Sequence, residues 1–179
     1  MPLHVVVGPM FAGKTSEALR IIRMSRSIHL TVLVLTHTSD VRYVKGCVSS
    51  HDFSSVPATL VSELMPVMHT PEYEKAHVIV IEEAQFFPDL LPFVQGSVQH
   101  KQVHVFGLDG DYKRQPMGDI LKLCPLADSF RKINALCSLC QDGTEAPFTV
   151  NTTAMPSSGV LVGGAEIYAA VCRSHFHLN

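Results

Sequence analysis

The sequence predicts an α/β protein built on a parallel sheet with helices on both faces, followed by a small metal-binding unit. Over residues 1–130, short apolar runs rich in β-branched residues alternate with segments of helical spacing, which is typical of a parallel sheet buried on both sides. After residue 130 the helical spacing is lost, and Cys, Gly, Ser, Thr and Pro become frequent. We therefore predict an α/β domain over residues 1–130 and a small domain over residues 131–179.

The strands and helices of the first part follow from residue spacing. Residues 3–7 form a β-branched apolar run that a Gly-Pro pair ends. A helix over residues 14–24 follows from the spacing of Ala18 and Ile22. The further predicted elements are strands over residues 31–35, 77–81 and 103–107, a helix over residues 87–99 with Pro88 in its first turn, and a loop or weak hairpin over residues 37–57.

Composition and charge restrict the class of protein. Of the 179 residues, 46% are hydrophobic and 17% are charged, so the chain can bury a sizeable core. The net charge of −2 argues against a broad cationic surface for nucleic acid or membrane. No secretory signal pattern opens the sequence, and no run approaches the roughly 20 apolar residues of a membrane helix. We expect a cytoplasmic chain with neither a nucleic-acid nor a membrane partner.

The strongest motif is a phosphate-binding loop. The segment GPMFAGKT matches G-x-x-x-x-G-K-[ST] and lies between a predicted strand and a predicted helix, where the mechanism requires it. Backbone N–H groups and the helix N-terminus favour phosphate oxygens, the Lys reaches the β- and γ-phosphates, and the Thr hydroxyl ligates Mg²⁺. The motif predicts a P-loop NTPase-type (RecA-like) sheet that binds ATP with Mg²⁺. Its phosphate-binding residues are Gly8, Pro9, Met10, Phe11, Ala12, Gly13, Lys14 and Thr15.

Two consecutive carboxylates, Glu82 and Glu83, follow the strand predicted over residues 77–81. At the carboxyl end of a parallel sheet both side chains can face a bound nucleotide. One carboxylate would serve Mg²⁺, and the other would act as general base toward a substrate hydroxyl. Spacing alone does not divide the two roles.

The second part carries a zinc pattern. Cys137 and Cys140 form one C-x-x-C knuckle, and Cys172 and His175 form a C-x-x-H knuckle about thirty residues later. Four such ligands suit a closed, structural Zn²⁺ site. His177 is an alternative fourth ligand. The remaining cysteines, Cys47 and Cys124, are interpreted as ordinary buried thiols.

In order along the chain, these motifs resemble the type II thymidine kinase family. The resemblance covers GPMFAGKT, the DVRY stretch from residue 40, EAQFF from residue 83, LDGDY from residue 108, the zinc knuckles and VGGAEIY from residue 162. It implies phosphorylation of the 5′-hydroxyl of thymidine, and of deoxyuridine, with ATP. By this resemblance Glu83 is the catalytic base, and Glu82 stands where the family usually has a Mg²⁺-associated Asp.

The resemblance also implies a site for the pyrimidine nucleoside. In the family a lasso segment closes over the base, and here it runs over residues 148–168 between the two zinc knuckles, which pin its ends. Asp40 is similar to a residue near Mg²⁺, and Arg42 and Arg114 resemble residues near the phosphates. Family members are typically tetramers inhibited by thymidine triphosphate (dTTP). The implied substrate-binding residues are Met10, Phe86, Leu108, Tyr112, Met117, Phe148, Thr149, Leu161, Gly163 and Tyr168.

Two other functions compete with this interpretation. A different P-loop enzyme would carry its own signature, but the guanine-reading [NT]-K-x-D motif is absent and the lasso lacks the Arg residues of a nucleotide-monophosphate kinase lid. A zinc-ribbon module for nucleic acid predicts basic residues around the knuckles, and only Arg131, Lys132 and Arg173 are close.

Overall fold

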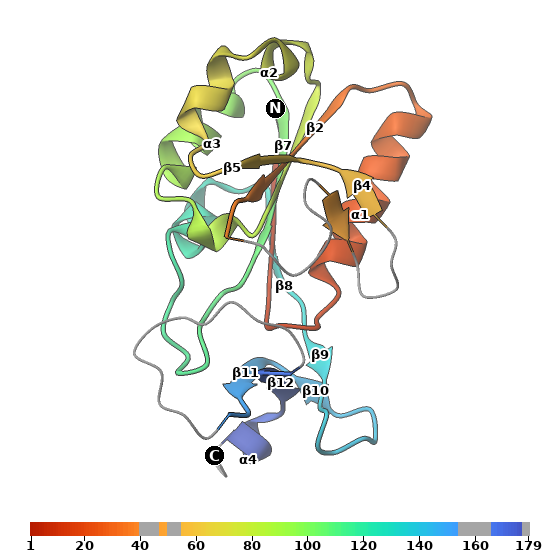
Figure 1. The fold of residues 1–179 in the computed structure, drawn as a ribbon, viewed down its shortest axis with the longest axis vertical. Helices are drawn as coiled ribbons and strands as arrows, with labels where there is room; N and C mark the ends of the chain where they lie inside the picture. The colour runs from red at the N-terminus through yellow and green to blue at the C-terminus, as the bar shows by residue number, and fades with distance from the viewer. Residues whose placement is uncertain (40–46, 50–54, 154–165, 177–179) are drawn as a thin grey trace.

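A computed structural model of the chain describes residues 1–39, 47–49, 55–153 and 166–176. Its centre is a six-stranded sheet in which every pairing is parallel, in the order β5-β2-β6-β7-β1-β8 (Figure 1). The predicted α/β fold class is therefore confirmed. The strands of this sheet are β1 (Leu3–Val7), β2 (Val32–His37), β5 (Thr59–Val61), β6 (Val78–Glu82), β7 (Gln102–Gly107) and β8 (Ser129–Lys132).

Helices cover both faces of the sheet. Helix α1 (Lys14–Ser27) lies on one face, and helices α2 (Pro71–Lys75) and α3 (Leu90–Ser97) lie on the other (Figure 1). Strand residues alternate between two cores: Val80 and Phe106 pack with α1, and Ile79, Ile81 and Val105 pack with α3. This double burial explains the near-continuous apolar runs of the strands. The described residues of this part also form the 3-10 helices η1 (Met65–His69), η2 (Ala84–Phe86) and η3 (Ile120–Leu126).

Where the structure describes the second part, it forms two small antiparallel pairs and a short helix. Strand β9 (Ala135–Leu136) pairs with β10 (Glu145–Ala146), and β11 (Phe148–Asn151) pairs with β12 (Tyr168–Val171), which leads into α4 (Arg173–Phe176). These elements share a separate apolar cluster, against which the P-loop residues Phe11 and Ala12 pack. The P-loop thus packs against the apolar cluster of the second part.

Several boundaries differ from the predicted ones. The helix expected over residues 87–99 begins only at Leu90, because the chain first makes the turn η2 and Asp89 then accepts hydrogen bonds of 2.7 Å from the backbone N–H groups of Leu64 and Met65. Strand β8 pairs with β1 through Lys132, so the predicted domain boundary after residue 130 lies inside a strand of the sheet. The division into two domains itself stays a prediction.

The region expected to be a loop or weak hairpin contains the antiparallel pair β3 (Cys47–Ser49) and β4 (Ser55–Pro57). The buried-thiol interpretation of Cys124 is wrong: this residue lies in η3 beside Pro125 and is exposed to solvent. The side chain of Cys47 lies outside the described part of the chain. Within the described residues, no helix has both the length and the apolar character needed to cross a membrane.

Candidate functional site

The P-loop leaves the carboxyl end of β1 and enters α1, and its geometry depends on two glycines. Gly13 precedes α1 with a φ of 82°, a left-handed conformation that favours glycine. A Cβ at Gly8 would lie 2.2 Å from the carbonyl oxygen of Ile133, so only glycine fits there. The two glycines allow the tight turn between β1 and α1, which places the N-terminus of α1 at the carboxyl end of the sheet.

The Lys and Thr that close the motif contact the loop itself and the end of β6. The Lys14 amino group donates hydrogen bonds to the carbonyl oxygens of Gly8 (3.1 Å) and Pro9 (2.6 Å). The Thr15 hydroxyl donates to Oε2 of Glu82 over 3.4 Å. The structure therefore joins the motif Thr to the first of the two predicted carboxylates, although β7 lies between β1 and β6 in the sheet.

Glu82 and Glu83 are both buried, at 4% and 8% exposure, yet they have different surroundings. Glu82 is the last residue of β6 and faces Thr15. Glu83 has a φ of 53°, a left-handed conformation that takes the chain out of the strand, and its Oε2 accepts a hydrogen bond of 2.6 Å from Nε2 of Gln85. The two carboxylates that spacing could not tell apart thus have separate partners.

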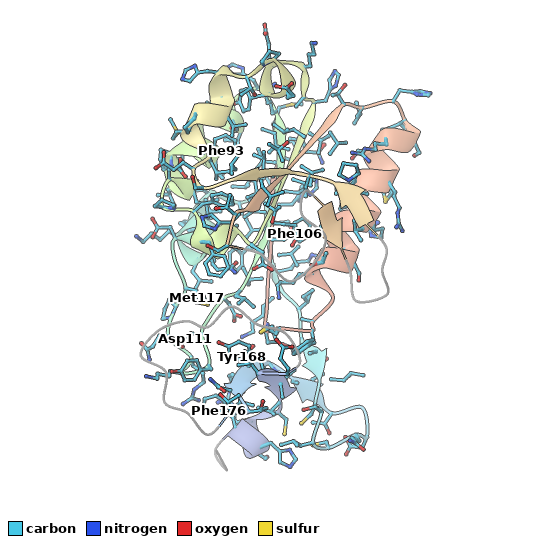
Figure 2. The ribbon with its side chains drawn as sticks, viewed as in Figure 1. Phe93, Phe106, Asp111, Met117, Tyr168 and Phe176 are labelled. Atoms are coloured by element: carbon cyan, nitrogen blue, oxygen red, sulfur yellow. The ribbon has the colours of Figure 1, made fainter. Side chains whose placement is uncertain are left out.

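The residues predicted to bind the base lie around the junction of the two parts. The backbone N–H of Met10 donates to Oγ1 of Thr149 over 3.0 Å, which ties the P-loop to β11. Met117 and Tyr168 are buried, at 9% and 6% exposure, and Figure 2 places both near this junction. Leu108, directly after β7, donates its backbone N–H to Oε1 of Gln85 over 3.0 Å.

A cavity of about 260 Å³ lies at the same junction. Phe148, Thr149 and Arg114 line it, together with Pro9 of the P-loop and Lys132 of β8. The other described residues predicted to bind the nucleoside do not line this cavity; they are Met10, Phe86, Leu108, Tyr112, Met117 and Tyr168.

Arg114, predicted to lie near the phosphates, contacts the zinc-bearing part. Its guanidinium lies 4.3 Å from the ring centre of Phe176 and 5.6 Å from that of Phe148. Lys132 forms an ion pair with Asp109 over 2.5 Å, from β8 to the loop after β7. The Arg114 contacts fasten the loop that follows β7 to the second part of the chain, and the ion pair fastens the same loop to the sheet.

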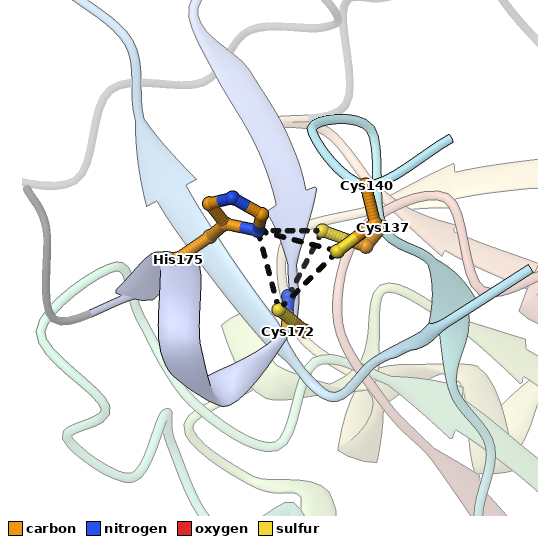
Figure 3. A group of neighbouring side chains, drawn as sticks. All are labelled: Cys137, Cys140, Cys172 and His175. Atoms are coloured by element: carbon orange, nitrogen blue, oxygen red, sulfur yellow. Dashed lines mark hydrogen bonds between the residues drawn. The ribbon is translucent and has the colours of Figure 1, made fainter. Parts of the chain in front are cut away.

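The four predicted zinc ligands converge (Figure 3). Their ligand atoms all lie within 4.8 Å of one another, although the two knuckles are about thirty residues apart in the sequence. Nδ1 of His175 is 3.3 Å from Sγ of Cys140 and of Cys172, and these two sulfurs are 3.7 Å apart. Neighbouring ligand atoms around a tetrahedral Zn²⁺ lie roughly 3.5–3.8 Å apart, so the cluster fits this ion.

Backbone N–H groups prepare the cluster for a metal cation. Burial acts to raise the pKa of the Cys137 thiol, but backbone N–H donors, led by that of Cys172 at 3.3 Å, outweigh burial and lower this pKa to about 6. A thiolate is the form that binds zinc. The pKa of Cys172 is lowered as well, by the backbone N–H of His175, whereas burial and the neighbouring thiols raise the pKa of Cys140 to about 11. Two of the three thiols are therefore shifted toward the form that binds zinc.

Five residues named from the sequence lie outside the described part of the chain: Asp40, Arg42, Leu161, Gly163 and His177. Conversely, residue chemistry alone did not single out Gln85 or the acceptor role of the Thr149 hydroxyl. An amide carries no titratable group, so its role shows in its place between Glu83 and the residue that follows β7. A sequence signal existed in Gly107 and Gly118, which leave space for Gln85.

Comparison with known proteins agrees with this geometry. A family model described as thymidine kinase matches residues 1–176. The chain is 41% identical to a thymidine kinase of Oryza sativa subsp. japonica, with 97% of the chain and 65% of that protein covered. It is 36% identical to the thymidine kinase of Yaba monkey tumor virus, with 99% and 96% covered.

A third relative is "Thymidine kinase, cytosolic" of Gallus gallus, which is 37% identical with 96% of this chain and 75% of the relative covered. The family model extends over the P-loop, both glutamates and both zinc knuckles. The chain therefore belongs to the thymidine kinase family.

Proposed function

We propose that the protein transfers the γ-phosphate of ATP to the 5′-hydroxyl of thymidine, giving thymidine monophosphate and ADP. The observation that carries this proposal is that the two buried glutamates have different partners. Glu82 contacts Thr15 of the P-loop, whereas Glu83 follows the end of β6 and accepts a hydrogen bond from Gln85. A kinase of a small hydroxyl substrate needs one carboxylate for the metal and another for the proton. Family membership supplies the substrate class.

The P-loop would hold the phosphates and the metal. Backbone N–H groups over residues 8–15 and the N-terminus of α1 favour the phosphate oxygens, and Lys14 adds its positive charge. A hydroxyl beside a carboxylate is an oxygen donor set that suits Mg²⁺, so Thr15 and Glu82 would hold this ion together with Asp40. When bound, Mg²⁺ neutralises charge that develops on the phosphates.

Glu83 would act as the general base. The 5′-oxygen of thymidine forms a bond to the γ-phosphorus as the bond from that phosphorus to the bridging oxygen of ADP breaks. The hydroxyl proton passes to the Glu83 carboxylate. Its burial at 8% exposure excludes most water from this carboxylate, which disfavours wasteful hydrolysis of ATP.

The nucleoside would lie at the junction between the P-loop, the loop after β7, and β11. The buried Met117 and Tyr168 and the Thr149 side chain support this placement. Within it, the proposed substrate-binding residues are Met10, Phe86, Leu108, Tyr112, Met117, Phe148, Thr149, Leu161, Gly163 and Tyr168, with Arg42 and Arg114 on the phosphate side. Deoxyuridine, which lacks only the base methyl group, is proposed as a second substrate.

Zinc would have a structural role. Cys137, Cys140, Cys172 and His175 close the site with four protein ligands, which leaves no position for a reacting water. Because β11 and β12 lie between the knuckles in the sequence, the ion would fix both ends of the lasso. We further propose a cytosolic homotetramer that is inhibited by dTTP and that has no nucleic-acid or membrane partner.

The experiment is a substrate panel with matched variants. Purified zinc-loaded protein with ATP and Mg²⁺ should convert thymidine, and deoxyuridine to a lesser extent, to monophosphates that chromatography resolves. Glu83→Gln should lose at least about 100-fold in kcat because the general base is gone, while ATP affinity stays near that of the wild type. Glu63→Gln, at an exposed position, is the control and should leave kcat unchanged.

Other outcomes decide against the proposal. ATP hydrolysis that is indifferent to nucleosides would favour another P-loop enzyme. Binding of single-stranded or duplex DNA, with no phosphorylation of thymidine, would favour the nucleic-acid module.

A further inference from the structure

Gln85 occupies an unusual position among the buried polar residues of the site. It is 4% exposed, and both ends of its side-chain amide are used. Nε2 donates to Oε2 of Glu83 over 2.6 Å, and Oε1 accepts from the backbone N–H of Leu108 over 3.0 Å. One side chain thereby connects the proposed base to the residue that follows β7.

The orientation of this amide is determined by its two neighbours. The N–H of Leu108 can only donate, so it must face the amide oxygen. The carboxylate of Glu83 accepts when ionised, so it must face the amide nitrogen. Flipping the amide by 180° would set oxygen against carboxylate and N–H against N–H, losing both hydrogen bonds.

The surrounding backbone holds Gln85 by close contact. A Cβ at Gly107 would lie 2.5 Å from Oε1 of Gln85. A Cβ at Gly118, whose φ is 55°, would lie 2.1 Å from the carbonyl oxygen of Gln85. Any larger residue at either position would displace the turn, so the two glycines let the backbone close on Gln85 from two sides.

From this geometry we propose that Gln85 is a positioning residue for phosphoryl transfer: it fixes the orientation of the Glu83 carboxylate relative to the strand end that faces the nucleoside. The inference rests on the proposed function. Glu83 needs such support because it sits in a left-handed backbone conformation directly after a strand. A short hydrogen bond to a carboxylate is stronger and more directional than one between neutral groups.

The test compares two substitutions that remove different parts of the contact. Gln85→Met keeps a side chain of similar length but has neither donor nor acceptor. Gln85→Glu keeps an oxygen for Leu108 and sets a second carboxylate against Glu83. Ser97→Ala is the control, because it removes a hydrogen bond of 3.0 Å between Ser97 on α3 and Tyr73 on α2, away from the site.

We expect Gln85→Met to lower kcat for thymidine by about 10- to 100-fold, since misplacing a reacting group by about 1 Å costs up to that factor. The dissociation constant of ATP should change less than about threefold, because the side-chain hydrogen bonds of Gln85 go to Glu83 and Leu108 and neither partner belongs to the P-loop. Ser97→Ala should lower the melting temperature and leave kcat near that of the wild type. This split separates positioning from a general loss of stability.

Gln85→Glu provides a readout that a purely structural role would not move. Two adjoining carboxylates share a proton more readily as the pH falls, and the protonated member is again a donor. Its kcat relative to the wild type should therefore rise between pH 8 and pH 6. This variant also keeps the proposal testable if Gln85→Met does not fold.

Three results overturn the inference. If both variants fold and keep kcat within threefold of the wild type, Gln85 does not position the base. If kcat falls in both variants, but the ratio of the Gln85→Glu kcat to the wild-type kcat is independent of pH, the loss is structural. If the wild type does not phosphorylate thymidine, the proposed function fails and the inference fails with it. If the wild type phosphorylates thymidine and both variants do so equally well, only the inference fails.

Discussion

Replacing Thr149 by Val removes a hydroxyl that joins the two parts of the chain while leaving nearly the same side-chain volume. In the wild type Oγ1 of Thr149 accepts a hydrogen bond of 3.0 Å from the backbone N–H of Met10, and the two residues are 6% and 7% exposed. The Val variant leaves this N–H buried without an acceptor, which costs about 1–3 kcal/mol in the free energy of unfolding. Thr149→Ser keeps the hydroxyl and loses one buried methyl group, at a cost of about 1 kcal/mol.

Urea unfolding followed by circular dichroism measures both variants against the wild type. The Val variant should unfold at lower urea with an unchanged slope, and the Ser variant should lie between it and the wild type. ATP affinity measured by calorimetry should also fall in the Val variant, since Met10 belongs to the P-loop. A Val variant as stable as the wild type, or more stable than the Ser variant, would refute the argument that this hydrogen bond holds the P-loop against β11.

Two further predictions concern the zinc cluster and a buried histidine. Metal analysis should find one zinc per chain in the wild type, and Cys137→Ser should lose this zinc and raise the KM for thymidine. The control Cys124→Ser changes an exposed thiol outside the cluster and should have neither effect. A wild-type protein that is active without metal would contradict the zinc assignment. Burial lowers the pKa of His104 to about 4, and the stacked ring of His4, 4.9 Å away, adds to this effect. The unfolded chain therefore takes up a proton on this side chain below about pH 6.5, whereas the folded chain takes it up only near pH 4. The free energy of unfolding should therefore fall by up to about 3 kcal/mol as the pH drops from about 6.5 to about 4. In urea titrations of His104→Gln, the free energy of unfolding should depend less steeply on pH than in the wild type. The same pH dependence in both proteins would contradict the assigned burial effect.

Local sequence patterns predict the parts of this molecule that depend on neighbouring residues. The P-loop lies between strand β1 and helix α1 as expected, because its glycines and the flanking apolar spacing act within one segment. The zinc knuckles converge as expected, because each C-x-x-C or C-x-x-H pair forms one half of a site by itself.

Features that depend on distant segments escape prediction. The position of β7 between β1 and β6 depends on which strands pair across the whole sheet, which periodicity does not encode. The continuation of the sheet into β8 is a similar case, because the pairing with β1 joins residues far apart in the chain. Both features decide where the first part ends and which strand ends meet at the site.

The division of the two glutamates shows the same limit at the scale of single side chains. Glu82 and Glu83 are adjacent and chemically identical, so spacing cannot assign the metal role to one and the base role to the other. At the level of sequence, only the family resemblance separates the two roles. The structure distinguishes them by the left-handed backbone at Glu83 and by the partners Thr15 and Gln85. Gln85 itself gave no chemical signal, because its role depends on what surrounds it.

The most direct test of the central proposal is transfer of the labelled γ-phosphate of ATP to defined nucleoside analogues. With Mg²⁺ present, the protein should transfer label to thymidine and to 3′-deoxythymidine, and it should transfer none to 5′-deoxythymidine, which lacks the accepting hydroxyl. Glu83→Gln should reduce the transfer to thymidine by at least about 100-fold. Transfer to 5′-deoxythymidine, or no transfer to thymidine by folded, zinc-loaded protein, would contradict the proposed function.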